Sequence, residues 1–570
     1  PDILCFYGVG NHGGGPTRAN VQTLTEMARA AATDPEAPRP VFSTPDRFFR
    51  AVESLGRPWP VVADDLQHHA RGCYTALSRV KRENRQAEHA LLTAERLAAV
   101  AHLTAGMPNR QAALQAAWEG VLVNQFHDIL AGTSIMSAYE DVWDLYDAAR
   151  RTAARVQEEA LTALEARFGL DVQAASRPPS AGSAPLAGEQ PVVVWNPLPW
   201  ERTEAVRVRA PMGRFRDDRV GVRYPAGVTV RDAAGAAVPA QIVDVELDYA
   251  TYMAHVEILA TVPALGWRVL YVTIPVGDPP AADPQPPTAD TLENDTLRLR
   301  VDPATGDLVS LVERATGREM LAEPAGALVI DDPSDTWSHG VPAFRDVIGR
   351  FRATQPPTLV ADGPAGRTLR VQSAWGDSTL VQEYTVRPGQ PGVEVAMTVD
   401  WHERLRMLKL AFPLALEDPR VTASAPYGCI GRAANGEEEP CQAWVDLSDD
   451  AGGLTLVNDS KYGYDALGGE LRLSVLRSPI YAFHEPRRVV PGVTYHYTDQ
   501  GAQTVRYRLL PHVGGWTAAH PGRADLELHA PLIGRLAGDA EGRAPEGSLL
   551  RVEPDHVALV AAKLAEDGQG

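Results

Sequence analysis

The first residues that could do chemistry lie in a glycine-rich segment near the start of the chain. Residues 8–17 read GVGNHGGGPT, so Asn11 and His12 stand among five glycines. Glycine lacks a Cβ and lets the backbone approach a ligand closely. Asn11 and His12 are therefore candidate site residues in a loop built for close approach. The alternative is a turn whose glycines serve only to keep the chain compact.

The same segment also matches the pattern GxGxxG, through Gly8, Gly10 and Gly13. A dinucleotide-binding interpretation needs an acidic residue at the end of a second strand and further βαβ units. The next apolar run ends in Ser43-Thr44-Pro45, and helices followed by sheets come after it. Nicotinamide binding is thus kept as an alternative that the order of elements disfavours.

A second candidate is the histidine in the segment NQFHDILAGTS, residues 124–134. On a helix counted from Trp118, His127 falls opposite Trp118 at about 100° per residue. We expect the imidazole to point away from the helical core, near the C-terminal end of the helix, where the dipole favours a cation or a metal. A zinc site takes three or four protein ligands, so a structural or surface histidine is the alternative. The side predicted to be apolar comprises Trp118, Val121, Leu122, Phe126 and Ile129.

The elements around these residues change in type along the chain. Strand-like and helix-like segments alternate over residues 1–57, which indicates part of an α/β architecture that is too short to close a barrel. Strands are expected at 2–7 and 40–43. Helices are expected at 17–32 and 46–55.

Residues 58–171 are strongly helical and predict a three-helix bundle with helices at 74–104, 109–129 and 137–168. A linker rich in proline, serine, alanine and glycine is predicted at 172–190, and a second at 277–291. Short β-branched runs predict a β domain at 191–276 and a large β-sandwich at 292–570, incomplete at its end. The predicted fold class is therefore multidomain α+β. The expected strands include 192–195, 205–208, 256–262, 268–274, 296–301, 368–372, 393–401 and 504–510.

The composition excludes several classes of function. The formal net charge is −19 and the pI about 5.3, without a dense Lys/Arg stripe, so we expect neither nucleic acid nor anionic membrane as a partner. No apolar run approaches the roughly 18 residues of a membrane span. Four cysteines without a CxxC motif favour a reducing, cytoplasmic location. The chain begins at Pro1 without a signal-peptide pattern, so we expect that its true start lies upstream and could carry one.

Several separately placed motifs together resemble glycoside hydrolase family 38, the class II α-mannosidases, in its bacterial form. They occur in that family's order and span nearly the whole chain. The motifs are GVGNHGGGPT, RGCYTALSRVKRENRQAEHALLTAERLA, NQFHDILAGTSI, DWHERLRMLKLAFP, APYGCIGR and VNDSKYGYDALGG.

The resemblance implies a catalytic β/α barrel, of which residues 1–57 would be the C-terminal remnant, then a three-helix bundle and large antiparallel β-sandwich domains. It also implies zinc as the cofactor, with His127 as the ligand from the bundle and Asp128 as a residue that hydrogen-bonds the sugar. Asn11 and His12 occupy the loop that can carry the acid/base carboxylate, and no acidic residue is present there. The implied partner is a mannose-containing oligosaccharide, and homo-oligomers are an expectation by analogy.

The residues needed for the whole reaction are not all in this chain. The resemblance places a His-x-Asp pair and the nucleophilic aspartate before the glycine-rich loop, where only seven residues stand. We therefore expect a fragment truncated at both ends, inactive by itself, of a zinc-dependent retaining enzyme that hydrolyses terminal α-mannosides. The alternative is a non-catalytic carbohydrate-binding or scaffolding protein.

Overall fold

The chain divides into two units, Pro1–Gln67 and His68–Gly570, and each is described by itself. Most of both predicted linkers, at 172–187 and 278–285, lies outside the residues that the structure describes. The structure is a computed structural model that describes residues 3–9, 14–34, 36–63, 68–170, 188–214, 224–248, 251–277, 286–484, 488–538, 544–554 and 557–565.

The first unit contains the two helices that the sequence predicts, α1 (Arg18–Ala30) and α2 (Pro45–Glu53). At the start of each helix, a threonine hydroxyl accepts a hydrogen bond from a backbone N–H of the first turn. This bond satisfies one of the unpaired donors of the helix end. These capping residues are Thr17 and Thr44.

The two strands predicted in this unit are wrong over the described residues. Residues 3–7 and 40–43 are irregular, and the one isolated bridge in the described part of the unit joins Val9 to Gly14. A strand persists only where a neighbouring strand pairs with its backbone groups. The apolar runs of this unit lack such a neighbour among the described residues.

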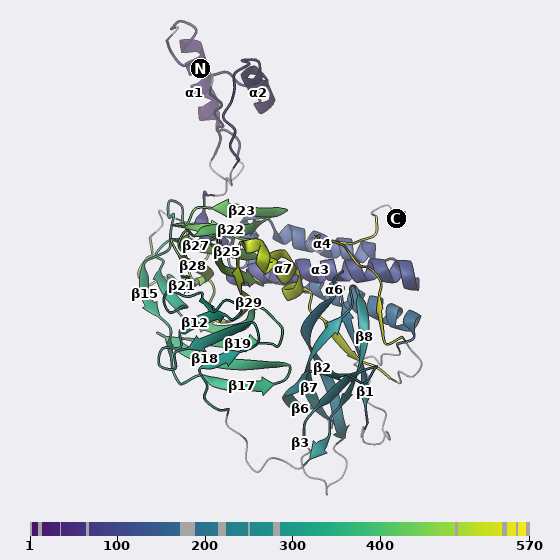
Figure 1. Cartoon of the computed structure of the whole chain (residues 1–570). Coiled ribbons are helices and arrows are strands. Elements are labelled where there is room, and N and C mark those ends of the chain that lie inside the picture. Colours follow the sequence, from purple (N-terminus) through teal and green to yellow (C-terminus); the bar gives the residue numbers. More distant parts are fainter. Residues whose placement is uncertain are drawn as a thin grey trace. The chain divides into compact units, whose positions relative to one another are not determined.

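Three long helices form the bundle at the start of the second unit, as predicted (Figure 1). Alanines with no exposed surface, such as Ala87, Ala94 and Ala160, let the helices approach closely. Glycines with positive φ, Gly106 and Gly169, end the first and last helices. No helix among the described residues has the length and apolar character needed to cross a membrane. The three helices are α3 (Ser78–Ala105), α4 (Gln111–Asn124) and α6 (Ala138–Phe168).

A small β domain packs against the bundle. Its central strand, β1 (Gln190–Asn196), is buried on both faces, because Val193 and Trp195 face the bundle and Val192 and Val194 face a second sheet. One sheet has the order β30-β1-β8-β4-β5, with β31 paired to β8, and the other the order β2-β7-β6; a short pair joins β3 to β9. The remaining bounds are β2 (Arg202–Arg214), β3 (Tyr224–Pro225), β4 (Thr229–Asp232), β5 (Ala237–Val238), β6 (Ala240–Asp248), β7 (Thr251–Val262), β8 (Gly266–Thr273), β9 (Val276–Gly277), β30 (Ile533–Leu536) and β31 (Glu546–Ser548).

Strands β30 and β31 belong to this small β domain although they lie near the end of the chain. Strand β30 pairs antiparallel with β1, and β31 pairs antiparallel with β8, so each pairs with a strand more than 250 residues earlier in the sequence. Strands β30 and β31 therefore complete the sheet that packs against the bundle. This pairing crosses the boundary predicted at residue 291.

The large β-sandwich follows, with antiparallel ladders and one shared apolar core (Figure 1). Its longest described sheet has ten strands in the order β16-β18-β19-β20-β29-β26-β25-β22-β23, with β17 paired to β18. The bounds are β16 (Arg352–Ala353), β17 (Thr358–Gly363), β18 (Gly366–Trp375), β19 (Ser378–Val386), β20 (Val393–Trp401), β22 (Arg420–Ala425), β23 (Gly428–Arg432), β25 (Trp444–Ser448), β26 (Gly452–Asn458) and β29 (Gly501–Val513).

Two further sheets complete the sandwich, in the orders β15-β14-β21-β28-β27-β24 and β10-β11-β12-β13. The short helix α7 (Pro521–His529) follows β29. The strands are β10 (Thr291–Glu293), β11 (Leu297–Val301), β12 (Leu308–Glu313), β13 (Arg318–Glu319), β14 (Gly326–Asp331), β15 (Val347–Arg350), β21 (Arg406–Pro413), β24 (Asn435–Pro440), β27 (Gly463–Leu467) and β28 (Glu470–Arg477).

Strand β20 shows why the sequence predicts this region well. Its buried residues alternate with outward ones, which is the period of a pleated strand with one face in a core. The observed bounds equal the predicted ones, residues 393–401. The buried residues are Val393, Val395, Met397, Val399 and Trp401.

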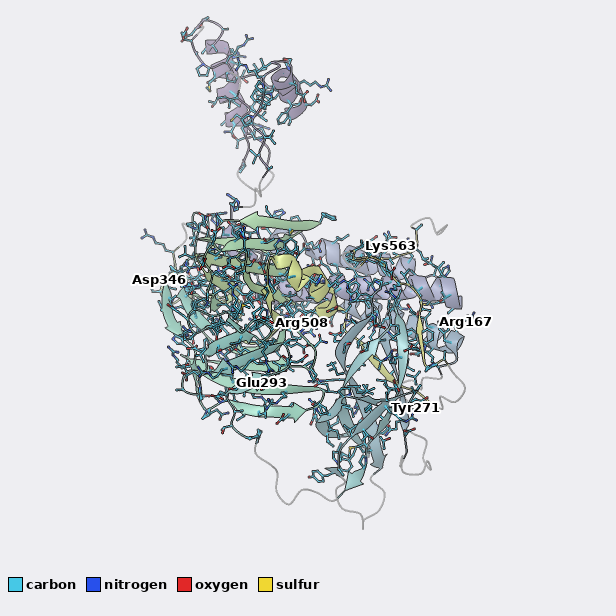
Figure 2. The ribbon with its side chains drawn as sticks, in the orientation of Figure 1. Arg167, Tyr271, Glu293, Asp346, Arg508 and Lys563 are labelled. Carbon is cyan, nitrogen blue, oxygen red and sulfur yellow. The ribbon has the colours of Figure 1, made fainter. Side chains whose placement is uncertain are left out.

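Charged residues join the sandwich to the small β domain. Arg508 of β29, labelled in Figure 2, donates to Glu204 of β2 at 2.9 Å. Both side chains are largely buried, so the pair is protected from screening by solvent.

The chain has only four lysines, and three of them are buried: Lys81, Lys409 and Lys461. Lys409 lies in the centre of β21 with no exposed surface and forms ion pairs with Glu438 and Asp465, which are equally buried. The two carboxylates raise the pKa of Lys409 despite its burial. The charged groups therefore depend on one another.

We predict that Lys409→Met lowers the free energy of unfolding by about 3 kcal/mol or more, because it leaves two buried carboxylates without a cation. Urea denaturation followed by circular dichroism measures this. The matched control is Lys563→Met at the exposed fourth lysine, where the expected change is within about 1 kcal/mol. Equal effects of the two substitutions would contradict the prediction.

Candidate functional site

The segment that carries His127 and Asp128 is a separate turn of helix. Helix α4 ends at Asn124, and α5 (His127–Leu130) begins after a residue in extended conformation, Phe126, with ψ of 141°. Asn124 is buried and its side-chain amide donates to the carbonyl of Val142 in α6 at 3.1 Å. This bond ties the end of α4 to the neighbouring helix while the chain changes direction.

Part of the prediction for this segment is wrong. A continuous helix to residue 129 does not form, so His127 lies in the first turn of α5 and not in the last turn of α4. His127 is therefore not part of the last turn of a long helix, on which the predicted attraction for a cation depends. The prediction that the imidazole points away from the core is confirmed, since 76% of the side chain is exposed.

A buried lysine holds the end of α5. The ammonium group of Lys81 donates to the carbonyl of Leu130 at 3.0 Å and to that of Ala76 at 2.6 Å. The carbonyls at a helix end have no partner within the helix, so a cation there satisfies them. Burial lowers the pKa of Lys81 to about 8, which still leaves it mostly charged at neutral pH.

The residues after α5 fix Asp128. Thr133 donates from its hydroxyl to Asp128 Oδ1 at 3.0 Å, and the buried Tyr139 hydroxyl donates to the Asp128 carbonyl at 3.3 Å. Gly132 has φ of +81°, and a Cβ there would stand 2.4 Å from the carbonyl oxygen of Ala76. The glycine of the AGTS sequence is therefore required for this close turn.

His127 and Asp128 lie side by side at the surface. Their closest atoms, Nε2 and Oδ2, are 3.5 Å apart, and 47% of Asp128 is exposed. An imidazole nitrogen and a carboxylate oxygen are ordinary zinc ligands. His127 fits one position of a zinc site, and the remaining ligands would have to come from outside α5.

The surface around this pair is unusually apolar. Large side chains before and after α5 are about half exposed or more, which is the pattern of a surface that contacts another domain or molecule. Two of them, Leu122 and Phe126, were predicted to face the bundle core. The set is Leu122, Val123, Phe126, Ile135 and Met136.

The other predicted site residues, Asn11 and His12, lie outside the described residues. The structure therefore describes only His127 and Asp128 among the predicted site residues.

One cluster that the sequence did not predict joins three histidines to a tryptophan. The ring centroid of His339 lies 4.6 Å from that of His69 and 5.3 Å from that of His484, and Trp337 lies 4.9 Å from His484. Burial and the neighbouring histidines lower the pKa of His339. These residues are far apart along the chain, and no local pattern in the sequence links them.

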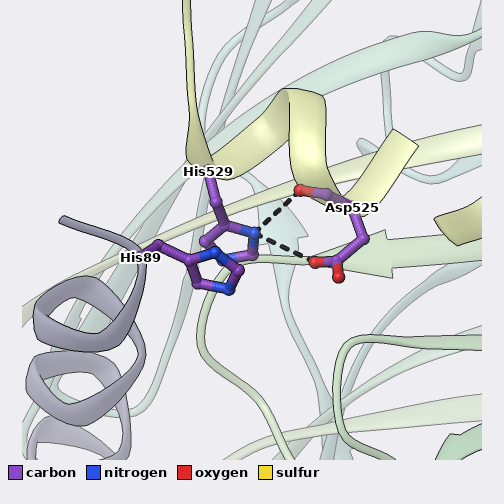
Figure 3. A group of neighbouring side chains, drawn as sticks. All are labelled: His89, Asp525 and His529. Atoms are coloured by element: carbon purple, nitrogen blue, oxygen red, sulfur yellow. Dashed lines mark hydrogen bonds and ion pairs between the residues drawn. The ribbon is translucent and has the colours of Figure 1, made fainter. Parts of the chain in front are cut away.

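A second unpredicted cluster lies between the bundle and the C-terminal helix. His89 of α3 and His529 of α7 stack with ring centroids 3.9 Å apart and an angle of 13° between the planes (Figure 3). Nδ1 of His529 lies 3.0 Å from Asp525 Oδ1. The three residues are distant in sequence, so no local pattern could reveal them.

The donor types His, Asp and His would suit a metal, and their ligand atoms lie within 4.8 Å of one another. The stacking argues against that use as the rings stand, because a nitrogen lone pair lies in its ring plane and two parallel planes cannot meet at one ion. Burial lowers the pKa of His89 well below its ordinary value, so this imidazole is neutral at neutral pH. We interpret the cluster as a contact that docks α7 on α3.

Sequence profiles of known families match two parts of the chain. The profile described as "Alpha mannosidase middle domain" matches residues 68–164, which include the bundle and α5. The profile described as "Glycosyl hydrolases family 38 C-terminal domain" matches residues 292–486 of the sandwich. The bundle and the sandwich therefore match the middle and C-terminal domains of α-mannosidases.

Relatives agree with this assignment. "Alpha-mannosidase 2C1" of Mus musculus is 29% identical over 98% of this chain and 49% of its own length. "Alpha-mannosidase G" of Dictyostelium discoideum is 22% identical over 91% of this chain and 47% of its own length. The chain contains the C-terminal domain of glycoside hydrolase family 38 and the α-mannosidase middle domain, and it spans about half the length of these relatives.

A solved structure supports the fold. The crystal structure of an α-mannosidase from Enterococcus faecalis V583 superposes with a TM-score of 0.69 at 17% identity and covers 94% of this chain and 66% of its own chain. At this identity the likeness supports the architecture alone.

We predict that Lys81→Met loosens α5 without unfolding the bundle. The carbonyl of Leu130 loses its donor, so amide hydrogens of residues 129–133 should exchange at least about tenfold faster. Hydrogen exchange with mass spectrometry measures this. Arg79→Met, an exposed position on the same helix, is the control and should leave these amides unchanged. Unchanged exchange in Lys81→Met would show that Lys81 does not support α5.

We also predict that the stacked pair makes stability depend on pH. Because the pKa of His89 is lower in the folded chain, its contribution is constant above about pH 6.5, the unfolded value, and stability falls as the pH decreases below it. The groups that face His89 are His529, Asp525, Arg85 and Arg96. The pKa of Asp525 is also lowered. Its effect on stability appears only below about pH 4, which is outside the pH range in which His89 matters.

The variant His89→Phe keeps a ring against His529 and cannot take a proton. Urea denaturation between about pH 7 and pH 5 should show a shallower loss of stability than the native chain. His402→Phe, at a histidine whose side chain is 48% exposed, is the control. If His89→Phe and His402→Phe change the pH dependence of the free energy of unfolding equally, the prediction is contradicted.

Proposed function

We propose that the protein is a zinc-dependent retaining α-mannosidase that hydrolyses terminal α-mannosides, to which this chain contributes the bundle and sandwich domains. The observation that carries the proposal is the His127–Asp128 pair, held on a rigid, exposed turn inside the region that matches the α-mannosidase middle domain. The names of the relatives supply the substrate class.

In this proposal, His127 supplies one imidazole ligand to the zinc. Zinc, when bound, would polarise sugar oxygens and stabilise negative charge on them. Asp128 accepts a hydrogen bond from a sugar hydroxyl, and the bond from Thr133 keeps one of its oxygens oriented. Asn11 and His12 are proposed for the glycine-rich loop of the same site.

The proposed site needs a second domain. Retaining hydrolysis takes two carboxyl groups about 5–5.5 Å apart, and the 570 residues contain no His-x-Asp sequence. The apolar side chains around α5 support contact with a domain that supplies these groups. We infer that this chain alone binds zinc weakly and does not turn over an α-mannoside.

We also propose a cytoplasmic enzyme that acts on mannose-containing oligosaccharides. The four cysteines are all free, which fits a reducing compartment.

We predict no hydrolysis of an aryl α-mannoside by the 570-residue chain with added zinc. Isothermal titration should show weak zinc binding that disappears in His127→Ala, because a single imidazole holds the ion. His89→Phe is the matched control for the stacked cluster and should bind zinc as the native chain does. Turnover by the chain alone would overturn the inference of inactivity, and zinc binding that survives His127→Ala would overturn the role of His127.

The reading frame upstream of Pro1 offers a second test. We expect it to encode a His-x-Asp pair, and the longer product should hydrolyse the aryl α-mannoside with kcat/KM at least about a hundredfold above that of its His127→Ala variant. A longer product that contains such a pair and hydrolyses no aryl α-mannoside would instead support a non-catalytic carbohydrate-binding protein.

A further inference from the structure

A cavity lies beside the candidate site, between the bundle and the sandwich. Its volume is 590 Å³, within the range of about 300–1,000 Å³ typical of small-molecule sites. The start of α3, the start of α6 and the segment before β29 form its walls. The lining residues that matter most are Arg79, Trp143, Arg404, Tyr481, Tyr497 and Asp499.

Asp499 provides an unsatisfied acceptor in the wall of this cavity. Its side chain is only 5% exposed, and Oδ2 accepts the backbone N–H of Ser78 at 3.0 Å. Oδ1 is buried and has no hydrogen-bond partner among the described residues. Buried polar atoms in folded proteins are nearly always paired, so an unpaired carboxylate oxygen that lines a cavity indicates a missing donor.

Two arginines bring hydrogen-bond donors to the same cavity. The guanidinium of Arg79 lies 4.0 Å from the ring centroid of Trp143, and that of Arg404 lies 5.1 Å from the ring centroid of Tyr497. Contact with a ring orients the guanidinium and leaves its N–H groups free to donate. In the part of the chain that the structure describes, neither arginine forms an ion pair with a carboxylate.

The buried Tyr139 side chain connects α5 to the lining of the cavity. The Tyr139 hydroxyl donates to the carbonyls of Asp128 and Ile129. Its ring contacts two residues of the cavity, with centroids 5.7 Å from Trp143 and 6.1 Å from Tyr481. A ligand in the cavity is thus separated from the turn that carries His127 by one buried side chain.

We propose that this cavity binds a neutral hexose unit, as a subsite for a second sugar of the glycan whose terminal mannose is cleaved. One sugar hydroxyl donates to Asp499 Oδ1, and others accept from Arg79 and Arg404. The half-buried rings of Tyr481 and Tyr497 pack against the apolar face of the sugar. The identity of this sugar as part of a mannoside rests on the proposed function; the hexose site itself rests on the cavity.

The need for a donor favours a neutral sugar over an anionic group. Three arginines and Asp499 line the cavity, and the buried Lys81 and Lys461 face Asp499. The unpaired Asp499 Oδ1 needs a hydrogen-bond donor, and a phosphate or carboxylate group offers none. A sugar hydroxyl fits both kinds of lining group, because it can donate to the Asp499 carboxylate and accept from the guanidinium groups.

Saturation-transfer NMR with the 570-residue chain tests the proposal. The probes are methyl α-mannoside, α-1,2-mannobiose and mannose 6-phosphate. We expect the two neutral sugars to bind, and Asp499→Asn and Arg404→Ala each to weaken them about tenfold, the loss of one charge-assisted hydrogen bond. The exposed Arg300 of β11 provides the matched control, Arg300→Ala, with unchanged affinity.

Asp499→Asn could weaken folding through the bond to Ser78, so the exposed Arg404→Ala provides an independent readout, and circular dichroism checks both variants. The proposal is overturned if no neutral sugar binds, if binding survives both substitutions, or if mannose 6-phosphate binds more tightly than methyl α-mannoside. Hydrolysis is not measured, so failure of the proposed mannosidase activity would leave this result standing.

Discussion

The junction between the bundle and the sandwich depends on charged groups buried at the start of α3. Arg71 pairs with Glu437 at 2.7 Å, the Ser78 amide donates to Asp499, and Lys461 donates to the Ser78 hydroxyl. A parallel bridge joins Ala76 to Arg477, whose guanidinium is itself paired with buried Asp332. Such groups are costly to bury and very costly to separate, so they define one arrangement of the two domains.

The same junction determines where the candidate site can stand. Lys81 lies on the first turns of α3, so the arrangement that places α3 on the sandwich also places the ammonium group that holds Leu130. Gly132 fits against Ala76 only because the backbone there is already fixed. The turn that carries His127 and Asp128 therefore packs on the same segment, residues 76–81, that contacts Arg477 and Asp499 of the sandwich region. The cavity next to α5 has the same origin, since Asp499 is both a junction residue and its buried acceptor.

The parts of the fold that the sequence predicts are those that local patterns determine. Alternation in β20 and the alanine-rich periodicity of α3 and α6 give their elements to within a few residues. Long-range pairing is different: nothing near Ile533 shows that β30 joins β1. The stacked His89 and His529 are equally hidden, because each is an ordinary helical histidine until α7 packs on α3.

The error at α4 has a physical reason that also bears on the site. Periodicity marks apolar positions but cannot distinguish a core from a surface that another domain covers. Leu122 and Phe126 were placed in the core on that basis, yet they lie exposed beside His127. A helix that needs an apolar face on both sides cannot keep one regular stripe, and the break at Phe126 turns α5 outward. Burying these side chains against a second domain would remove water around the His127–Asp128 pair, and a less hydrated site strengthens every electrostatic contact made there. In the proposed function, the exposed apolar side chains would contact a second domain, and that contact would shield the His127–Asp128 pair from water.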